Sequence, residues 1–194
     1  MQAIEIEVKF RVRDTQALEA TLPRLGFRCD TPRTFERNIL FDTPDRRLRN
    51  TRQILRLRRY AERWVLTHKQ TTPNDSPEAK HKERIETETI VEDGDAITAI
   101  FGALGYQPSF VYEKWRSEWS DGTGHCVIDQ TPIGDYAELE GPRDWIDRTL
   151  EALAVDQADV TILSYGRIFE LWQQQTGSSA QNMAFAEIEP AAVR

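Results

Sequence analysis

Pairs of like charges two residues apart recur along this sequence and are the residues best suited to do chemistry. The acidic residues in this pattern are Glu5, Glu7, Glu86, Glu88, Glu138 and Glu140, with Asp129 standing alone, and the basic residues are Lys9, Arg37, Arg56, Arg58, Lys69, Arg84, Lys114 and Arg116. Carboxylate oxygens suit hard ions such as Mg²⁺ or Mn²⁺, which prefer to share their ligands with phosphates. Arginine binds phosphate oxygens through paired hydrogen bonds and lysine binds them as a point charge. Metal ligands opposite cations therefore indicate a polyphosphate site.

The two-residue spacing predicts that these side chains lie on β-strands. In residues 4–12, isoleucine, valine and phenylalanine at even positions alternate with glutamate, lysine and arginine at odd positions, so one face is apolar and the other charged. For any single strand, a charged face turned to solvent is the common explanation. The same pattern recurs on strand after strand, however, and this repetition favours a shared charged interior.

The elements that must position these residues are predicted from periodicity and turn residues. Strands are expected over residues 4–12, 34–41, 53–60, 63–69, 83–91, 110–120, 125–129 and 136–140, and helices over residues 14–26, 93–105, 142–153 and 164–172. A sheet of eight strands tends to curl and close. Charges enclosed in it must be balanced by one another, by water and by a ligand. We therefore predict an α+β fold, an eight-stranded antiparallel closed β-barrel with flanking α-helices and a charged tunnel.

Length and composition set the remaining limits. The 194 residues predict a single domain over residues 1–175, followed by a loosely ordered tail over residues 176–194 that is rich in Gly, Ser, Ala and Gln. A net charge of -7 argues against a general nucleic-acid or anionic-membrane binder. The sequence has two cysteines, no leader pattern and no apolar stretch near 18 residues. These features favour a cytoplasmic protein.

The motif Glu5-Ile6-Glu7-Val8-Lys9 resembles the ExExK signature of the CYTH domain, also called the triphosphate tunnel metalloenzyme superfamily. Further motifs follow in the order typical of that family: Arg37-Asn38-Ile39-Leu40-Phe41-Asp42-Thr43, Leu55-Arg56-Leu57-Arg58, Leu66-Thr67-His68-Lys69, Arg84-Ile85-Glu86-Thr87-Glu88, Glu113-Lys114-Trp115-Arg116, Ile128-Asp129, Glu138-Leu139-Glu140-Gly141 and Ser164-Tyr165-Gly166. The resemblance covers residues 2 to 172, roughly, and is nearest to the class IV adenylate cyclase-like and triphosphatase branch.

The resemblance implies a tunnel that holds a triphosphate together with two Mg²⁺ or Mn²⁺ ions. The implied metal ligands are Glu5, Glu7, Glu138, Glu140 and Asp129, the implied triphosphate ligands are Lys9, Arg37, Arg56, Arg58, Lys69, Lys114 and Arg116, and the implied catalytic residues are Asp129 and Lys9. Further candidates are Arg84, Glu86, Glu88 and Arg167. Asp129 is either a metal ligand or the base. Lys80 to Glu83 are expected to form a solvated hairpin tip, and Tyr165 is a candidate to close one mouth of the tunnel.

Three activities are compatible with this motif set. We favour a divalent-metal-dependent triphosphatase acting on inorganic triphosphate or on a nucleoside or thiamine triphosphate, because a bare triphosphate accounts for every charged strand. The first alternative is a class IV adenylate cyclase that converts ATP to cyclic AMP and pyrophosphate. The second is a non-catalytic module that binds triphosphate or polyphosphate, which would need no acidic metal ligands. The expected partner is a small triphosphate-containing molecule, with no specific nucleic acid and no membrane, and the chain is expected to be a monomer or homodimer.

Overall fold

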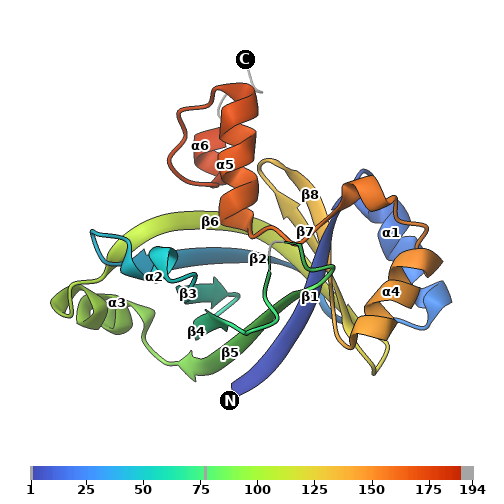
Figure 1. The fold of residues 1–194 in the computed structure, drawn as a ribbon, viewed down its shortest axis with the longest axis horizontal. Coiled ribbons are helices and arrows are strands. Elements are labelled where there is room, and N and C mark those ends of the chain that lie inside the picture. The colour runs from blue at the N-terminus through green and yellow to red at the C-terminus, as the bar shows by residue number, and fades with distance from the viewer. Residues whose placement is uncertain (1, 77, 189–194) are drawn as a thin grey trace.

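One closed antiparallel sheet dominates the computed structural model, which describes residues 2–76 and 78–188 (Figure 1). Its strands are β1 (Gln2–Val12), β2 (Arg28–Asp42), β3 (Ile54–Tyr60), β4 (Arg63–Thr71), β5 (Lys82–Val91), β6 (Gln107–Ser120), β7 (His125–Thr131), β8 (Gly134–Glu140) and the short β9 (Val160–Thr161). The spatial order is β5-β4-β3-β2-β6-β7-β8-β1-β9, and an additional pairing of β5 with β1 closes the barrel. The predicted eight-stranded antiparallel barrel is confirmed, with β9 as an added strand.

Both faces of β1 are buried, and this excludes a sheet whose charges face water. Val8 and Phe10 are 1% and 4% exposed on the outer face, while Glu7 and Lys9 are 5% and 4% exposed on the inner face. The outer face is covered by apolar residues of the helices. The inner face is covered by the opposite wall of the barrel, so its charges lie in an enclosed interior.

Helices cover the barrel from several sides. They are α1 (Thr15–Thr21), α2 (Arg47–Asn50), α3 (Gly94–Ala103), α4 (Arg143–Ala152), α5 (Tyr165–Thr176) and α6 (Phe185–Ile188), with 3₁₀ turns at Leu22–Leu25 and Gln157–Asp159. In Figure 1, α1 and α4 lie together at one side of the barrel, α3 lies at the other side, and α5 stands above β6. Trp145, Ile146 and Leu150 of α4 pack with Val8 and Phe10 in one apolar core.

The first helix shows why its sequence was readable. The Asp14 side chain accepts a hydrogen bond from the backbone N–H of Ala17, which satisfies one of the free donors at the start of α1. Pro23 follows within a 3₁₀ turn, and Gly26 ends the segment with φ of 91°. Proline lacks the N–H that a continuing helix needs, and glycine tolerates the left-handed conformation. The helix predicted over residues 14–26 therefore ends in a 3₁₀ turn.

The C-terminal segment differs from the expected loosely ordered tail. Met183 is fully buried, its N–H donates to the Val111 carbonyl at 3.0 Å, and its own carbonyl accepts from the Glu113 N–H at 2.9 Å. These bonds form a parallel bridge between Tyr112 and Met183. The sequence gives no periodic signal here because one apolar anchor and backbone pairing attach the segment. The tail predicted over residues 176–194 is therefore attached to the barrel at Met183, whereas residues 189–194 lie outside the described residues.

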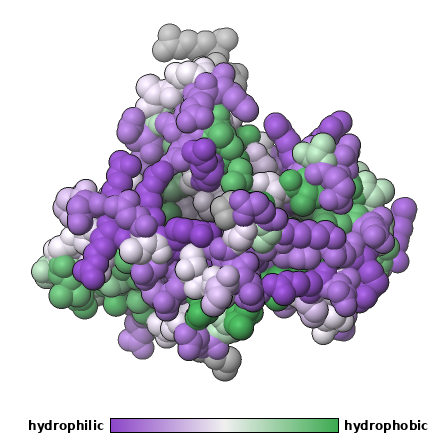
Figure 2. Space-filling model, viewed as in Figure 1, coloured by the Kyte–Doolittle hydropathy of each residue, from purple (hydrophilic) through white to green (hydrophobic). Residues whose placement is uncertain are grey.

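The outer surface is mostly polar. Figure 2 shows hydrophilic side chains over most of the visible face. The large apolar side chains left exposed include Ile100 and Leu104, at the end of α3. Within the described part of the chain, every helix is too short or too polar to cross a membrane.

Candidate active site

Four glutamates gather on the inner face where β1 meets β8. The β1–β8 register places Glu7 opposite Glu140 and Lys9 opposite Glu138, and Glu5 lies two residues before Glu7. The side chain of Glu140 makes no hydrogen bond or ion pair with any residue that the structure describes. Burial, followed by the charges of Glu5 and Glu7, raises the pKa of Glu140 to about 8. Burial and the charge of Glu7 also raise the pKa of Glu5. The surroundings therefore favour the protonated form of Glu140, and a divalent cation bound there would favour its ionised form.

Three lysines hold the same glutamates. Lys69 Nζ lies 2.5 Å and 2.7 Å from the two carboxylate oxygens of Glu5. Lys9 Nζ lies 3.1 Å from Glu7 Oε1 and 3.4 Å from Glu138 Oε1. Each ammonium neutralises a carboxylate that a metal ion would otherwise bind, so metal binding requires these bonds to be exchanged.

The third lysine corrects the expectation of a solvated hairpin tip. Lys82 is 7% exposed, and its Nζ lies 2.6 Å from Glu7 Oε1. It opens β5, and since alternate residues share a face, it points inward with Arg84 and Glu86. The preceding Lys80 and His81 turn the other way, toward Asp147 of α4. The two-residue spacing that continues from Glu88 back to Lys82 was the signal that could have identified it.

Asp129 of β7 gathers the cations on another wall. It is fully buried and accepts hydrogen bonds from Lys114 Nζ at 2.9 Å, from two nitrogens of Arg116 at 2.7 Å and 2.6 Å, and from the Tyr165 hydroxyl at 2.7 Å. Although burial opposes ionisation, Arg116 and Lys114 hold the pKa of Asp129 well below its usual range. Four donors use the lone pairs of one carboxylate, so Asp129 would have to give up a donor before it bound a metal ion or a water.

Two arginines of β3 extend this basic wall. Arg56 donates to the hydroxyls of Thr67 at 3.1 Å and Tyr112 at 3.4 Å. Arg58 lies 3.4 Å from Glu88 and 3.7 Å from Glu36. The Nε atoms of both arginines are buried without a hydrogen-bond partner among the described residues. Buried donors of this kind are expected to meet water or a ligand, and phosphate oxygens suit them.

On β2, the charged residue that lies inside the barrel is Glu36, and not the predicted Arg37. Arg37 was predicted as a triphosphate ligand, but the structure places it on the outer face, with its side chain 54% exposed and its Nε 3.7 Å from Glu113 Oε1. Its neighbour Glu36 is fully buried inside. Glu36 lies within 3.8 Å of Arg58, Lys114 and Arg116. Despite its burial, the charges of Lys114 and Arg116 hold the pKa of Glu36 well below its usual range.

The remaining candidates take different places. Glu86 lies inside, 3.2 Å from Lys69 Nζ. Arg84 donates to the Arg52 carbonyl at 2.9 Å and lies 3.2 Å from Asp75, so the loop between β4 and β5 holds it. Arg167 donates to Glu170 at 2.9 Å, and its side chain is 49% exposed, so the structure keeps it apart from the interior cluster.

The donors inside the barrel fit Mg²⁺ or Mn²⁺ in their chemistry. The carboxylates of Glu5, Glu7, Glu138 and Glu140 supply only oxygen ligands, which these ions prefer. As the described side chains stand, no three acidic, histidine or cysteine residues enclose a point where an ion could sit. Glu5 and Glu7 are instead bonded to Lys69 and Lys82.

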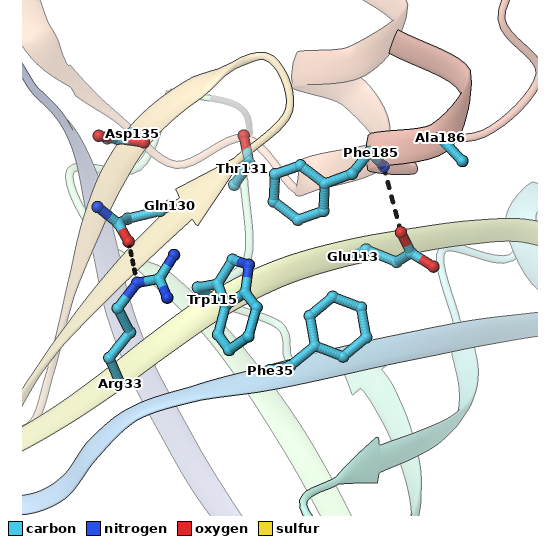
Figure 3. A pocket seen from close by; sticks show the side chains of 9 residues that line it. All are labelled: Arg33, Phe35, Glu113, Trp115, Gln130, Thr131, Asp135, Phe185 and Ala186. Atoms are coloured by element: carbon cyan, nitrogen blue, oxygen red, sulfur yellow. Dashed lines mark hydrogen bonds between the residues drawn. The ribbon is translucent and has the colours of Figure 1, made fainter. Parts of the chain in front are cut away.

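A separate cavity lies on the outer face, away from this interior. It has a volume of about 630 Å³ and is lined by side chains that include Arg33, Phe35, Glu113, Trp115 and Phe185 (Figure 3). The Arg33 guanidinium lies 4.1 Å from the centre of the Trp115 ring. None of the charged residues of the interior cluster lines it.

Comparison with known proteins identifies similar sequences. The family model of the CYTH domain matches residues 3–157. A protein of Methanocaldococcus jannaschii, whose name proposes an adenylate cyclase, is 29% identical over 138 residues, 71% of this chain and 76% of its own. The adenylate cyclase CyaB of Aeromonas hydrophila is 27% identical over 140 residues, 70% of this chain and 67% of its own.

Solved structures share the fold at lower sequence identity. A protein of Vibrio parahaemolyticus, described as a proposed adenylate cyclase, has a TM-score of 0.73 at 20% identity and covers 86% of this chain and 98% of its own. A protein of Hippeastrum, described as having a dominant triphosphatase activity, has a TM-score of 0.65 at 18% identity and covers 88% of this chain and 96% of its own. At these identities the structures support the barrel fold.

Proposed function

This chain belongs to the CYTH domain family, and from that premise we propose that it is a divalent-metal-dependent triphosphatase acting on a linear triphosphate inside the barrel. One observation carries the proposal. The barrel buries an acidic corner at Glu5, Glu7, Glu138 and Glu140 beside a wall of buried cations. The attraction within buried ion pairs only partly repays their lost hydration, and a triphosphate bound with a metal ion would pair with both kinds of charge.

The cations would bind the phosphate chain. Arg58, Lys114 and Arg116 all lie within 3.8 Å of Glu36, which holds side chains of β3 and β6 side by side. Arg56 adds a buried Nε without a partner in the described chain. Fixed donors of this kind stabilise the charge that develops on phosphoryl oxygens during in-line transfer. Positioning and electrostatics thus supply most of the catalysis expected from this chain.

The acidic corner would hold the metal. A divalent ion bound there would act as a Lewis acid toward the phosphoryl group and toward a water nucleophile. Glu5, Glu7, Glu138 and Glu140 would supply its protein ligands, and Lys9, between Glu7 and Glu138, would bridge the acidic corner to the phosphates. Tyr165 fills the interior beside Asp129 and Lys114, where it would exclude water.

An adenylate cyclase is the second candidate. Both curated relatives carry that name, and the structural neighbour from Hippeastrum is described as a proposed adenylyl cyclase with a dominant triphosphatase activity. Cyclisation would need the same phosphate ligands together with a site that places the ribose 3′-hydroxyl in line with the α-phosphorus. We favour hydrolysis because the charged lining described above accounts for a triphosphate without a nucleoside site.

Product analysis tests the proposal. The purified chain is incubated with Mg²⁺, and separately with Mn²⁺, against inorganic triphosphate, ATP and thiamine triphosphate, and phosphate, pyrophosphate and cyclic AMP are quantified. We expect phosphate release without cyclic AMP. Cyclic AMP with stoichiometric pyrophosphate would replace hydrolysis with cyclisation. Binding of triphosphate without any product would leave a binding module.

Matched glutamate variants locate the activity in the barrel. Glu138→Gln removes one carboxylate from the acidic corner and is expected to abolish turnover while triphosphate binding persists. Glu113→Gln removes one carboxylate from the outer face, where Glu113 pairs with Arg37, and is expected to retain turnover. Equal loss in both variants would place the effect in folding and remove support for the interior site.

A further inference from the structure

Lys82 is a buried ammonium placed directly against the acidic corner. The β1–β5 register pairs it with Glu7 across the two strands, and its Nζ lies 2.6 Å from Glu7 Oε1. Lys82 and Glu7 are 7% and 5% exposed. A close opposite-charge pair on neighbouring strands has a fixed geometry, and burial makes its Coulomb interaction strong.

Lys82 is the least well compensated of the three lysines in this corner. Among the described residues, Lys9 lies against two carboxylates, Glu7 and Glu138, and Lys69 lies against Glu5 and Glu86. Lys82 lies against one carboxylate, that of Glu7. Glu7 Oε1 already accepts a second ammonium, from Lys9. A cation that binds Glu7 therefore deprives Lys82 of the one carboxylate with which it pairs in the described chain.

We propose that Lys82 is a built-in counter-ion that competes with the divalent metal for Glu7 and so sets the metal affinity of the triphosphate-free barrel. This inference rests on the proposed function, because it assumes that Glu7 is a metal ligand. A metal ion that binds Glu7 must displace the ammonium from an oxygen only 2.6 Å away. The two cations would otherwise repel each other at close range.

The displaced ammonium remains within a barrel that contains few free acids. Glu5 is bonded to Lys69, Asp129 is bonded to Lys114 and Arg116, and Glu140 lies with the acids that the metal takes. An incoming triphosphate supplies anionic oxygens for the released Lys82. Triphosphate and metal should therefore each strengthen the binding of the other, as linkage between two sites requires.

The test measures Mn²⁺ binding to the full chain without substrate, by the electron paramagnetic resonance signal of free Mn²⁺ at fixed pH. Lys82→Met is expected to bind Mn²⁺ about tenfold more tightly than the wild type, because it removes a positive charge that lies a few ångströms from the ion. Lys82→Arg keeps the charge and should stay near the wild type. Lys80→Met is the charge-matched control, since Lys80 is 63% exposed and pairs with Asp147.

A second measurement adds inorganic triphosphate to each titration. The wild type should show Mn²⁺ affinity that rises with triphosphate, and Lys82→Met should show a smaller rise. If the role of Lys82 is purely structural, Lys82→Met should lower the melting temperature of the protein without tightening Mn²⁺ binding. If Lys82→Met does not fold, Lys82→Gln replaces it, because the amide can still donate to Glu7 without a charge.

The outcomes separate the two claims. If the wild type binds Mn²⁺ and Lys82→Met binds it equally or more weakly, the role of Lys82 is overturned. The metal site itself then stands. A wild-type chain that binds no Mn²⁺, with or without triphosphate, overturns the metal-dependent function together with this inference. Tightening in Lys82→Met alone, with Lys80→Met at the wild-type affinity, supports the counter-ion.

Discussion

Most of the charged residues described inside this barrel lie against an opposite charge. Asp129 shows this most fully, since its carboxylate joins Lys114, Arg116 and the hydroxyl of Tyr165. Removing one partner from such a set leaves the others buried and uncompensated, and this costs more than the pair itself contributes. Substitutions inside the barrel must therefore be judged by stability as well as by activity.

Replacing Asp129 by asparagine should lower the free energy of unfolding by about 3–5 kcal/mol, because Lys114 and Arg116 stay buried without their shared anion. Urea unfolding monitored by tryptophan fluorescence measures the change. Asp159→Asn is the control, since Asp159 pairs at 3.6 Å with Arg13, whose side chain is 85% exposed, and such pairs contribute roughly 0–1 kcal/mol. Equal effects in the two variants would contradict the central place given to Asp129.

Glu140 should make the metal-free protein less stable as the pH rises. Its pKa is raised from 4.5 to about 8 in the folded state, so between those values the folded chain binds more protons than the unfolded chain. The contribution of Glu140 to the free energy of unfolding is thus fully present below about pH 4.5. It is lost as the pH rises through about 8.

Urea unfolding of the metal-free protein at several pH values between 5 and 8 tests this dependence. Glu140→Gln should reduce the decline in stability over that range, because the amide does not titrate. Glu151→Gln, on the exposed side of α4, should keep the wild-type decline. A Glu140→Gln profile parallel to that of the wild type would show that the raised pKa belongs to another group.

The sequence predicted most interior residues but placed one on the wrong face. Glu5, Glu7 and Lys9 were assigned correctly to the inside because residues 4–12 alternate without exception. On β2, Glu36 and Arg37 are adjacent charges, and the resemblance favoured Arg37. The apolar Phe35, Ile39 and Phe41 share the parity of Arg37 and would have placed it outside. The roles of the charged interior residues in metal or phosphate binding stay predictions.

At the scale of elements, two glycines of α3 meet opposite surroundings. A Cβ at Gly94 would lie 2.3 Å from the ring of Trp64, whereas a Cβ at Gly102 would have nothing within 4 Å. Gly94→Ala should therefore destabilise the protein by about 1–3 kcal/mol through overpacking. Gly102→Ala should stabilise it by roughly 0.5–1 kcal/mol, because alanine loses less backbone entropy in a helix.

Thermal or urea unfolding of the two alanine variants supplies the comparison, and each variant is the control for the other. If both substitutions changed the free energy of unfolding in the same direction, the close approach of Gly94 to Trp64 would not explain the difference predicted between them. Elements with a repeating pattern, such as α3, were predictable from sequence. The segment held by Met183 was not, because its attachment is a backbone bridge to β6 with no local periodicity.

At the scale of the whole molecule, the sequence predicted the eight strands of the barrel but not which strands pair with one another. Local alternation identifies a strand without naming its partner, and β2 pairs with β6, far along the chain, as well as with β3. Closure was inferred only because eight charged faces needed a common interior. The β1–β5 pairing completes it.

A closed, charged interior predicts that ligand binding stabilises the entire fold. Inorganic triphosphate with Mg²⁺ at one hundred times the dissociation constant should add about 2.7 kcal/mol to the free energy of unfolding. For a chain of this length the melting temperature should rise by roughly 5–10 °C. Monophosphate with Mg²⁺ is the control and should have a smaller effect. No shift with triphosphate would contradict an interior site.

The pairing of β1 also has a consequence for synthesis of the chain. Its partners are β5, β8 and β9, so residues 2–12 cannot complete their hydrogen bonds until a large part of the chain has been made. Translation of the roughly 140 residues up to the end of β8 takes on the order of ten seconds. Throughout that time the apolar side of β1 has no permanent cover. Long-range closure is therefore expected to limit the rate at which this barrel folds.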